Sequence, residues 1–352
     1  MSRNLTIKAA SLVMALGILA GCGGAKAPEQ APAKAPENKP AAVSFKAGMV
    51  SDVGGLNDHS FNEAAYGGLT KLKADGLAGE VKGVESKRQE DYEPNMQNLV
   101  DAKFDIVWGI GFLMGDATAA QAKKNPNQKF GLIDSVVEAP NVASITFKEE
   151  EGSFLMGVIA AKTTKSKKVG FVGGMDIPVI HHFEAGFKAG VLSIDPTVQV
   201  QTVYTGKFDD PAAGKNTALA MINSGADVIF HAAGGTGDGA IEAAKEKKVY
   251  AIGVDKDQNS LGKDTVISSM MKRVDEATYM VSKQVKEGKF KAGVTALGLK
   301  ENGVGTAPST RWDLMPADTK ALVEKWAEAI KSGKVVVPND MEKFKTFKAP
   351  QL

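Results

Sequence analysis

Short apolar runs alternate with amphipathic segments along the chain from Phe45 onward. Nearly continuous apolar runs of this length predict buried strands, and apolar positions at helical spacing predict helices between them. The predicted strands are residues 45–50, 80–86, 104–110, 129–134, 142–147, 167–174, 198–206, 226–233, 249–255 and 265–271. The clearest predicted helices are residues 62–75, 114–125, 152–164, 183–194, 212–225 and 238–248. This alternation predicts βαβ units with parallel, buried sheets.

The predicted units form two similar halves that meet near Thr146–Glu151. Each half has the size of one doubly wound domain. The tail after Asp275, a predicted helix to Lys289 followed by "KAGVTALGL", is long enough to cross back and complete both lobes. We therefore expect an α/β fold of two doubly wound parallel-sheet lobes joined by hinge crossings, near Thr146–Glu151, near Met271–Asp275 and after Phe290. The expected lobes are residues 44–148 with about 273–297, and residues 149–272 with about 298–352.

Residues 1–21 are expected to be a lipoprotein signal peptide and not part of the fold. Arg3 and Lys8 give a basic start, and the apolar run from Ala9 to Ala20 is too short to span a bilayer. The run ends in "LAGC", which resembles a bacterial lipobox and implies cleavage before Cys22 and lipid attachment to it. An ordinary signal peptide followed by a chance cysteine is the alternative.

Residues 22–43 are rich in Ala, Pro and Lys and show no apolar period, which predicts a disordered tether. The expected localisation is therefore the cell membrane, with a folded domain anchored through Cys22 on the extracytoplasmic side. Cys22 is the only cysteine in the sequence, so the folded domain contains neither a disulfide nor a reactive thiol.

Composition and charge narrow the classes of partner. The sequence is 43% hydrophobic and has 43 Lys and Arg against 41 Asp and Glu, as expected of a globular protein with nearly balanced charge. A nucleic-acid partner is not expected, because it would need a basic surface. The four histidines, His59, His181, His182 and His231, lack metal-binding spacing, and no G-x-S-x-G motif is present. We expect no catalytic residues, no metal and no cofactor.

Polar and aromatic residues follow several predicted strands at the point where each strand ends. Open parallel sheets bind ligands at the carboxyl ends of their strands, so two such sheets would place these residues around one cleft. Phe183 is expected in the first turn of its helix. The candidate ligand-binding residues are Asp52, Phe61, Asn62, Asp134, Phe183, Phe208, Gly234, Asp255 and Lys272.

These residue types favour a nucleoside. Three unpaired carboxylates can accept hydrogens from the vicinal diol of a sugar, and aromatic rings stack on a base. Asn62 offers a donor and an acceptor to a purine edge, and Lys272 partly offsets the acidic cluster. Each residue also has an ordinary structural interpretation: an aspartate can cap a helix, a phenylalanine can pack between lobes and a lysine can lie in solvent.

The segment "GGTGDG", Gly234 to Gly239, has the strand–glycine–helix arrangement of phosphate-binding loops. Its spacing does not complete G-x-G-x-x-G, and no Walker Lys-Ser/Thr follows. Asp238 would repel an anion at this helix start. The segment therefore favours an uncharged nucleoside over a nucleotide.

Six motifs resemble the basic membrane protein family, also called the purine nucleoside receptor family. They are "DVGGLNDHSFNEAAYGGL", "HHFEAGFKAGV", "YTGKFDDPAAGK", "DVIFHAAGGTGDG", "IGVDKDQ" and "SSMMKRVDEATY", and the resemblance runs from Phe45 to about Gly305. It implies a type I periplasmic-binding-protein fold, purine nucleosides as ligands and separate ABC transporter permease subunits as partners.

The family's ligand contacts map onto the same nine candidates. Asp255 falls on the expected ribose-diol acceptor, and Phe183 and Phe208 are alternatives for the stacking aromatic of the second lobe. Asn57 and His59 are left out of the site. The expected function is capture of a nucleoside by hinge closure and its delivery to an ABC importer by a monomeric binding protein. A sugar or signal-molecule receptor on the same fold and a nucleoside hydrolase are the alternatives.

Overall fold

The computed structural model describes residues 44–352. The predictions of a signal peptide over residues 1–21, a lipid anchor at Cys22 and a tether over residues 22–43 lie outside the described residues. Within the described part of the chain, every helix is too short or too polar to cross a membrane.

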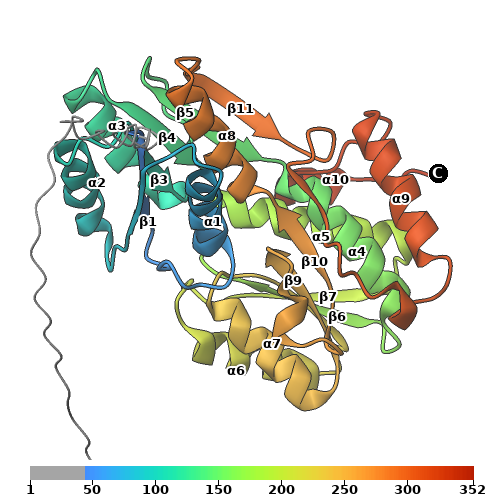
Figure 1. The fold of residues 1–352 in the computed structure, drawn as a ribbon. Helices are drawn as coiled ribbons and strands as arrows, with labels where there is room; N and C mark the ends of the chain where they lie inside the picture. The colour runs from blue at the N-terminus through green and yellow to red at the C-terminus, as the bar shows by residue number, and fades with distance from the viewer. Residues whose placement is uncertain (1–43) are drawn as a thin grey trace, which may run out of the picture. The chain divides into compact units, whose positions relative to one another are not determined.

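Two six-stranded sheets organise the chain (Figure 1). The first sheet has the order β11-β5-β4-β3-β1-β2. Its strands are β1 (Lys46–Ser51), β2 (Glu80–Val84), β3 (Ile106–Ile110), β4 (Lys129–Ile133), β5 (Val142–Phe147) and β11 (Gly293–Leu297). The second sheet has the order β12-β10-β9-β8-β6-β7. Its strands are β6 (Lys168–Gly173), β7 (Gln199–Tyr204), β8 (Val228–Ala232), β9 (Tyr250–Asp255), β10 (Val266–Lys272) and β12 (Val304–Thr306).

Helices cover both sheets. The helices that pack on the first sheet or on one another beside it are α1 (Phe61–Ala74), α2 (Tyr92–Asp101), α3 (Gly115–Lys124) and α8 (Val274–Lys286). The helices of the second half are α4 (Glu149–Thr163), α5 (Pro178–Ile194), α6 (Pro211–Asn223), α7 (Thr236–Lys247), α9 (Thr319–Lys331) and α10 (Met341–Thr346). Short 3₁₀ turns lie at residues 89–91, 112–114, 258–261 and 312–314.

The two sheets repeat one strand order. In the first sheet β2-β1-β3-β4-β5 are neighbours, and in the second β7-β6-β8-β9-β10 are neighbours in the same sequence. This is a doubly wound order, in which the strands that follow the first strand of the sheet are added on both sides of it. In such sheets ligands bind at the switch point beside that first strand. Strands β1 and β6 are therefore equivalent, and so are β4 and β9.

The described part of the chain passes between the sheets three times. The passages run from β5 to α4, from β10 to α8 and from β11 to β12. We propose lobe boundaries at residues 148/149, 272/273 and 297/298, a division that this sheet pairing supports.

Among residues 44–352, the prediction of parallel pairing holds for every strand pair except one. β12 pairs antiparallel with β10, through the register Met270 with Thr306 and Lys272 with Val304. This three-residue strand was not predicted, because it is too short for an apolar period to mark it.

The prediction that Phe183 lies in the first turn of its helix is wrong. Helix α5 begins at Pro178, which places Phe183 in the second turn. Proline suits the first helical position because its φ is already helical and the missing N–H would have no partner there. The helices α2, α9 and α10 were not among the clearest predicted ones.

The packing of α4 against α5 depends on glycines. A Cβ atom at Gly157 would lie 2.2 Å from the backbone oxygen of Phe187, and one at Gly190 would lie 2.0 Å from the backbone oxygen of Phe154. Both distances are far below a normal contact, so only glycine allows the two backbones to approach this closely. On its other side α4 packs against α9, where the rings of Phe154 and Trp326 lie 4.9 Å apart. Helix α4 is thus buried nearly all round, as its mostly apolar sequence requires.

Candidate ligand-binding site

A cavity lies where the carboxyl ends of the two sheets face each other. The space between its lining atoms is about 560 Å³, including the part that opens to solvent. The structure brings all nine residues predicted from the sequence to this one cavity: Asp52, Phe61, Asn62, Asp134, Phe183, Phe208, Gly234, Asp255 and Lys272. Their contacts with a ligand stay a prediction.

Asp52 and Asn62 form one polar end of the cavity. Asp52 follows β1, and its Oδ1 accepts a hydrogen bond from Asn62 Nδ2 at 2.9 Å and from the backbone N–H of Gly54 at 3.0 Å. Burial raises the pKa of Asp52, although the hydrogen bond from Asn62 opposes this change. One amide hydrogen of Asn62 is therefore already used, while its Oδ1 is buried and has no hydrogen-bond partner among residues 44–352. This end of the cavity is rich in acceptors.

Asp134 and Asp255 occupy equivalent places in the two lobes. Asp134 directly follows β4, and Asp255 is the last residue of β9. Both have a left-handed backbone, with φ of +65° and +63°. Among residues other than glycine, aspartate and asparagine tolerate this conformation best, and such outliers are frequent at functional sites. The same backbone turn thus ends both strands at the cavity.

Lys272 lies between two carboxylates. Its Nζ is 2.5 Å from Asp134 Oδ2 and 2.9 Å from Glu149 Oε1, and all three side chains are at most 5% exposed. Burial disfavours the ammonium, but Asp134, Glu149 and Asp255 outweigh it and raise the pKa of Lys272. The interpretation of Lys272 as a solvated lysine is therefore wrong, because burial and two ion pairs hold it inside.

The prediction of three unpaired carboxylates is also wrong. Asp134 is paired with Lys272, and Asp255 Oδ2 accepts a hydrogen bond of 2.5 Å from Ser60 Oγ in the other lobe. Burial raises the pKa of Asp134 and of Asp255, while Lys272 opposes both changes. Only one oxygen of Asp134, Oδ1, is buried without a hydrogen-bond partner in the described part of the chain.

Aromatic rings line the cavity from both lobes. Phe61 begins α1, and its ring centroid lies 5.0 Å from Lys272 Nζ. Phe183 lies on the opposite lobe, with its ring centroid 5.5 Å from the same ammonium. Phe208 packs against Gly174, where a Cβ would lie 2.3 Å from its ring. Both second-lobe candidates for stacking, Phe183 and Phe208, therefore line the cavity.

Asp58 is a cavity residue that the sequence analysis missed. Its carboxylate accepts hydrogen bonds from the backbone N–H groups of Ser60, Asn62 and Glu63, at 2.9 to 3.0 Å. These bonds satisfy donors at the start of α1, which have no partner within the helix. Asp58 thereby fixes the helix start that holds Phe61 and Asn62. An acidic residue just before a predicted helix was the available signal.

Glu149 was also missed, because it acts through Lys272. It opens α4 directly after the first passage between the sheets, in the sequence "KEEEG". Its second oxygen lies 3.0 Å from His182 Nδ1. Other lining residues are apolar and gave no chemical signal, such as Phe112 and Leu113 in a 3₁₀ turn and Ile177 just before α5.

Ligand atoms of Glu149, Glu150 and His182 lie within 4.8 Å of one another, the one grouping of this kind among the described residues. Glu149 already binds Lys272 and His182 there. A cation would have to compete with the Lys272 ammonium for the same carboxylate, so we assign no metal to it.

A family model described as ABC transporter substrate-binding protein PnrA-like matches residues 45–340. The chain belongs to this PnrA-like family. The resemblance inferred from the six sequence motifs is thereby confirmed. The PnrA-like chain is 36% identical to the CD4+ T-cell-stimulating antigen of Listeria innocua, over 96% of this chain and 99% of that protein. It is 37% identical to the ABC transporter nucleoside-binding protein BmpA of Lactococcus lactis subsp. cremoris, over 84% of this chain and 90% of that protein.

A solved structure also resembles the PnrA-like chain. It is an ABC transporter solute-binding protein from Aeropyrum pernix K1, with a TM-score of 0.79 and 31% identity, and the match covers 86% of this chain and 96% of that one. The predicted fold class, two parallel-sheet α/β lobes of the periplasmic-binding-protein type, is confirmed.

Proposed function

We propose that this PnrA-like protein captures a purine nucleoside between its lobes and delivers it to the permease of an ABC importer. The observation that supports the ligand class best is the pair Asp134 and Asp255, which present buried carboxylates from equivalent strand ends of the two lobes. A carboxylate accepts two hydrogen bonds from a vicinal diol with good geometry. Lys272 lies beside both and offers hydrogens to ring or hydroxyl oxygens.

The opposite polar end suits a base with N–H groups. Asp52 and the free Oδ1 of Asn62 are acceptors, and Phe61, Phe183 and Phe208 supply aromatic faces. Four carboxylates line the same space, so a phosphate would be repelled. The name of the Lactococcus relative, a nucleoside-binding protein, supports the same assignment.

The remaining parts of the proposal concern the membrane attachment of the protein, its oligomeric state and the fate of its ligand. The lipobox-like "LAGC" supports attachment to the extracytoplasmic side of the membrane through a lipid on Cys22. We propose that the protein acts as a monomer. We also propose that it releases its ligand unchanged. In the cavity Asp134 is paired with Lys272 and Asp255 with Ser60, and no activated nucleophile is present among the described residues.

Calorimetric titration of the purified protein with inosine, guanosine, adenosine, ribose and a nucleoside monophosphate tests the proposal. We expect binding of at least one purine nucleoside, with weak or no binding of ribose and of the monophosphate. A micromolar affinity requires about 8 kcal/mol. Mass spectrometry of the nucleoside after incubation should return it intact.

The matched variants are Asp255→Asn and Asp264→Asn. Asparagine tolerates the left-handed backbone of Asp255, so the first change removes the charge and keeps the fold. It should weaken nucleoside binding by about 2 kcal/mol, the value of hydrogen bonds to a charged group. Asp264 is 97% exposed, and its replacement should leave binding unchanged. Absence of heat with every purine nucleoside, preferential binding of ribose or release of free base would overturn the proposal.

A further inference from the structure

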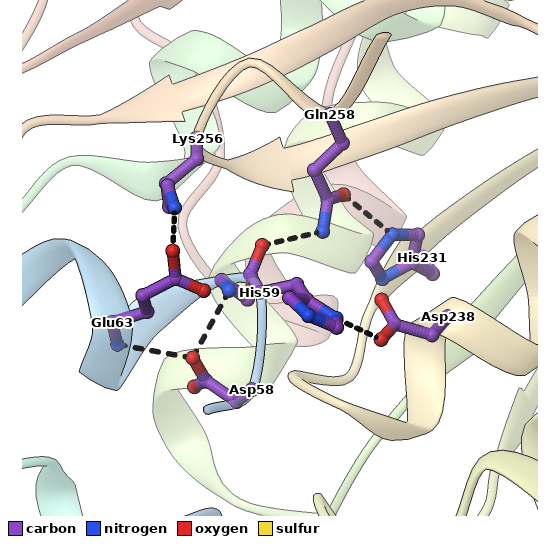
Figure 2. Close-up of polar contacts among 8 residues, drawn as sticks. Asp58, His59, Glu63, His231, Asp238, Lys256 and Gln258 are labelled. Atoms are coloured by element: carbon purple, nitrogen blue, oxygen red, sulfur yellow. Dashed lines mark hydrogen bonds and ion pairs between the residues drawn. The ribbon is translucent and has the colours of Figure 1, made fainter. Parts of the chain in front are cut away.

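The segment from Asp58 to Glu63 of the first lobe touches the second lobe beside the cavity (Figure 2). It contains the end of the connection from β1 to α1 and the first three residues of α1. Residues 238, 256 and 258 of the second lobe meet it there, from α7 and from the turn after β9. We call the five residues that make these contacts the clasp: His59, Glu63, Asp238, Lys256 and Gln258.

One lysine–glutamate ion pair and one histidine–aspartate contact cross between the lobes in the clasp. Glu63 Oε1 lies 2.5 Å from Lys256 Nζ, and His59 Nδ1 lies 2.7 Å from Asp238 Oδ2. The side chains of the first pair are 37% and 36% exposed, so solvent screens it in part. In Figure 2 both pairs bridge the ribbon of the first lobe to that of the second. The pairs can exist only when the lobes are together.

A buried hydrogen bond adds to these pairs. Gln258 Nε2 donates to the backbone oxygen of His59 at 3.1 Å, and Gln258 is 2% exposed. Its Oε1 accepts from His231 Nε2 and from the backbone N–H of Val254, both at 2.9 Å. Burial lowers the pKa of His231 to about 4, so the ring is neutral at pH 7. The second lobe therefore fixes the amide of Gln258 with its N–H₂ group toward the first lobe.

The backbone of His59 is adapted to this contact. Its φ is +49°, in the left-handed region that residues with a side chain rarely adopt. Such a conformation persists where surrounding bonds compensate for it. Asp58 on one side and Gln258 across the lobes supply those bonds.

The clasp is separate from the ligand cavity. All nine predicted ligand residues line the cavity, whereas none of the five clasp residues does. Ligand contacts can favour closure only when a ligand is present. Clasp contacts form in every closure, as do the Ser60–Asp255 hydrogen bond and the Asp134–Lys272 ion pair at the cavity. A contact made only in the closed form increases its population, whether or not a ligand is bound.

We propose that the five clasp residues hold the lobes together independently of the ligand and so set how often the unoccupied protein closes. The same contacts slow opening, which lowers the release rate of a bound ligand more than they change its association rate. This inference goes beyond the proposed function, because it requires two lobes that move and not a particular ligand.

The first test measures closure without ligand. Spin labels on Cys residues introduced at exposed Lys73 in α1 and Lys245 in α7, in a full-length Cys22→Ala background, report the distance between lobes. Glu63→Lys should raise the ratio of open to closed molecules at least about threefold, and Gln258→Ala should raise it about tenfold. Adding Lys256→Glu to Glu63→Lys should restore the ratio, because the pair is then reversed and intact.

The control is Glu242→Lys. Glu242 pairs with Lys215 at 2.7 Å, but both residues lie in the second lobe, so this change should leave the ratio unaltered. Unchanged distances in Glu63→Lys and Gln258→Ala, or failure of the reversed pair to restore closure, would overturn the clasp. Inosine titration of the same samples separates this result from the proposed function. Altered closure without any inosine binding would support the clasp and count against the nucleoside site, and normal binding with unaltered closure would do the opposite.

Discussion

Lys272 provides the sharpest test of how the cavity is held together. Its ammonium contacts Asp134 and Glu149, and the three side chains are 2%, 5% and 1% exposed. Lys272→Met keeps a long side chain in the same space and removes the charge. Two carboxylates then stay buried without the cation that compensates them.

The expected cost follows from that burial. Removing one partner of a buried ion pair typically destabilises a protein by about 3–5 kcal/mol, because the remaining charge keeps its desolvation penalty. Lys256→Met is the matched control, since its pair with Glu63 is more than one-third exposed. Exposed pairs contribute at most about 1 kcal/mol. The two lysine variants should therefore differ clearly in the free energy of unfolding.

The pH dependence gives a second readout. Burial raises the pKa of Asp134 to about 7, against the opposing effect of Lys272. Loss of the ammonium should raise this pKa further. A carboxyl group whose pKa is higher in the folded state than in the unfolded state stabilises the fold at low pH and loses that contribution as pH rises through the folded pKa. Lys272→Met should therefore regain stability between pH 8 and pH 5.

Urea denaturation followed by circular dichroism at pH 8 and pH 5 measures both effects. Adding Glu149→Gln to Lys272→Met removes one uncompensated carboxylate and should recover part of the loss, which a double-mutant cycle quantifies. A cost for Lys272→Met no larger than that of Lys256→Met, with no recovery at pH 5, would refute the reasoning.

Further predictions concern stability at four sites. Gly157→Ala should destabilise by about 1–3 kcal/mol, because its Cβ would meet the backbone of α5. Gly67→Ala in α1, where nothing lies within 4 Å, should stabilise by up to about 1 kcal/mol, and equal shifts in the thermal midpoints of the two variants would contradict this. Ser282→Ala should cost about 1–3 kcal/mol in urea denaturation, because buried Trp108 Nε1 loses its 3.0 Å acceptor, and an unchanged denaturation midpoint would argue against that role. Burial lowers the pKa of His231 to about 4, so stability should be complete above about pH 6.5 and fall by up to about 3 kcal/mol toward pH 4. His231→Gln should flatten that profile, and an equally steep profile in the variant would show that another group is responsible.

The fold and the cavity residues could be predicted because both depend on local patterns and one topological rule. Apolar runs marked the strands. In a parallel sheet the residues at the carboxyl ends of the strands, such as Asp134 and Asp255, lie at one edge, and the cavity lies where these edges of the two lobes meet. The partners of those residues could not be predicted in the same way. Glu149 is separated from Lys272 by more than a hundred residues, and only the packing of α4 beside β10 brings them together.

The role of His59 could not be predicted from the sequence either. The family motif gave it no ligand contact, and it lines no part of the cavity. Its role in the clasp depends on Asp238 and Gln258, which approach it only when the two sheets face each other. The spacing of residues in the sequence contains no information about how close His59 lies to Asp238 and Gln258.

The third passage of the chain has a consequence for how the protein is made. Helix α8 packs against α1, where Thr278 Oγ1 donates to the backbone oxygen of Ala65, and β11 completes the first sheet beside β5. Both elements are translated after β6 to β10 of the second sheet. As the chain emerges in order, the lobe that begins first therefore cannot be finished until residue 297 is available, by which time most of its neighbour already exists. A nascent chain that stops between β10 and β11 would present β5 as an open edge, so the two lobes mature together and not in the order of their synthesis.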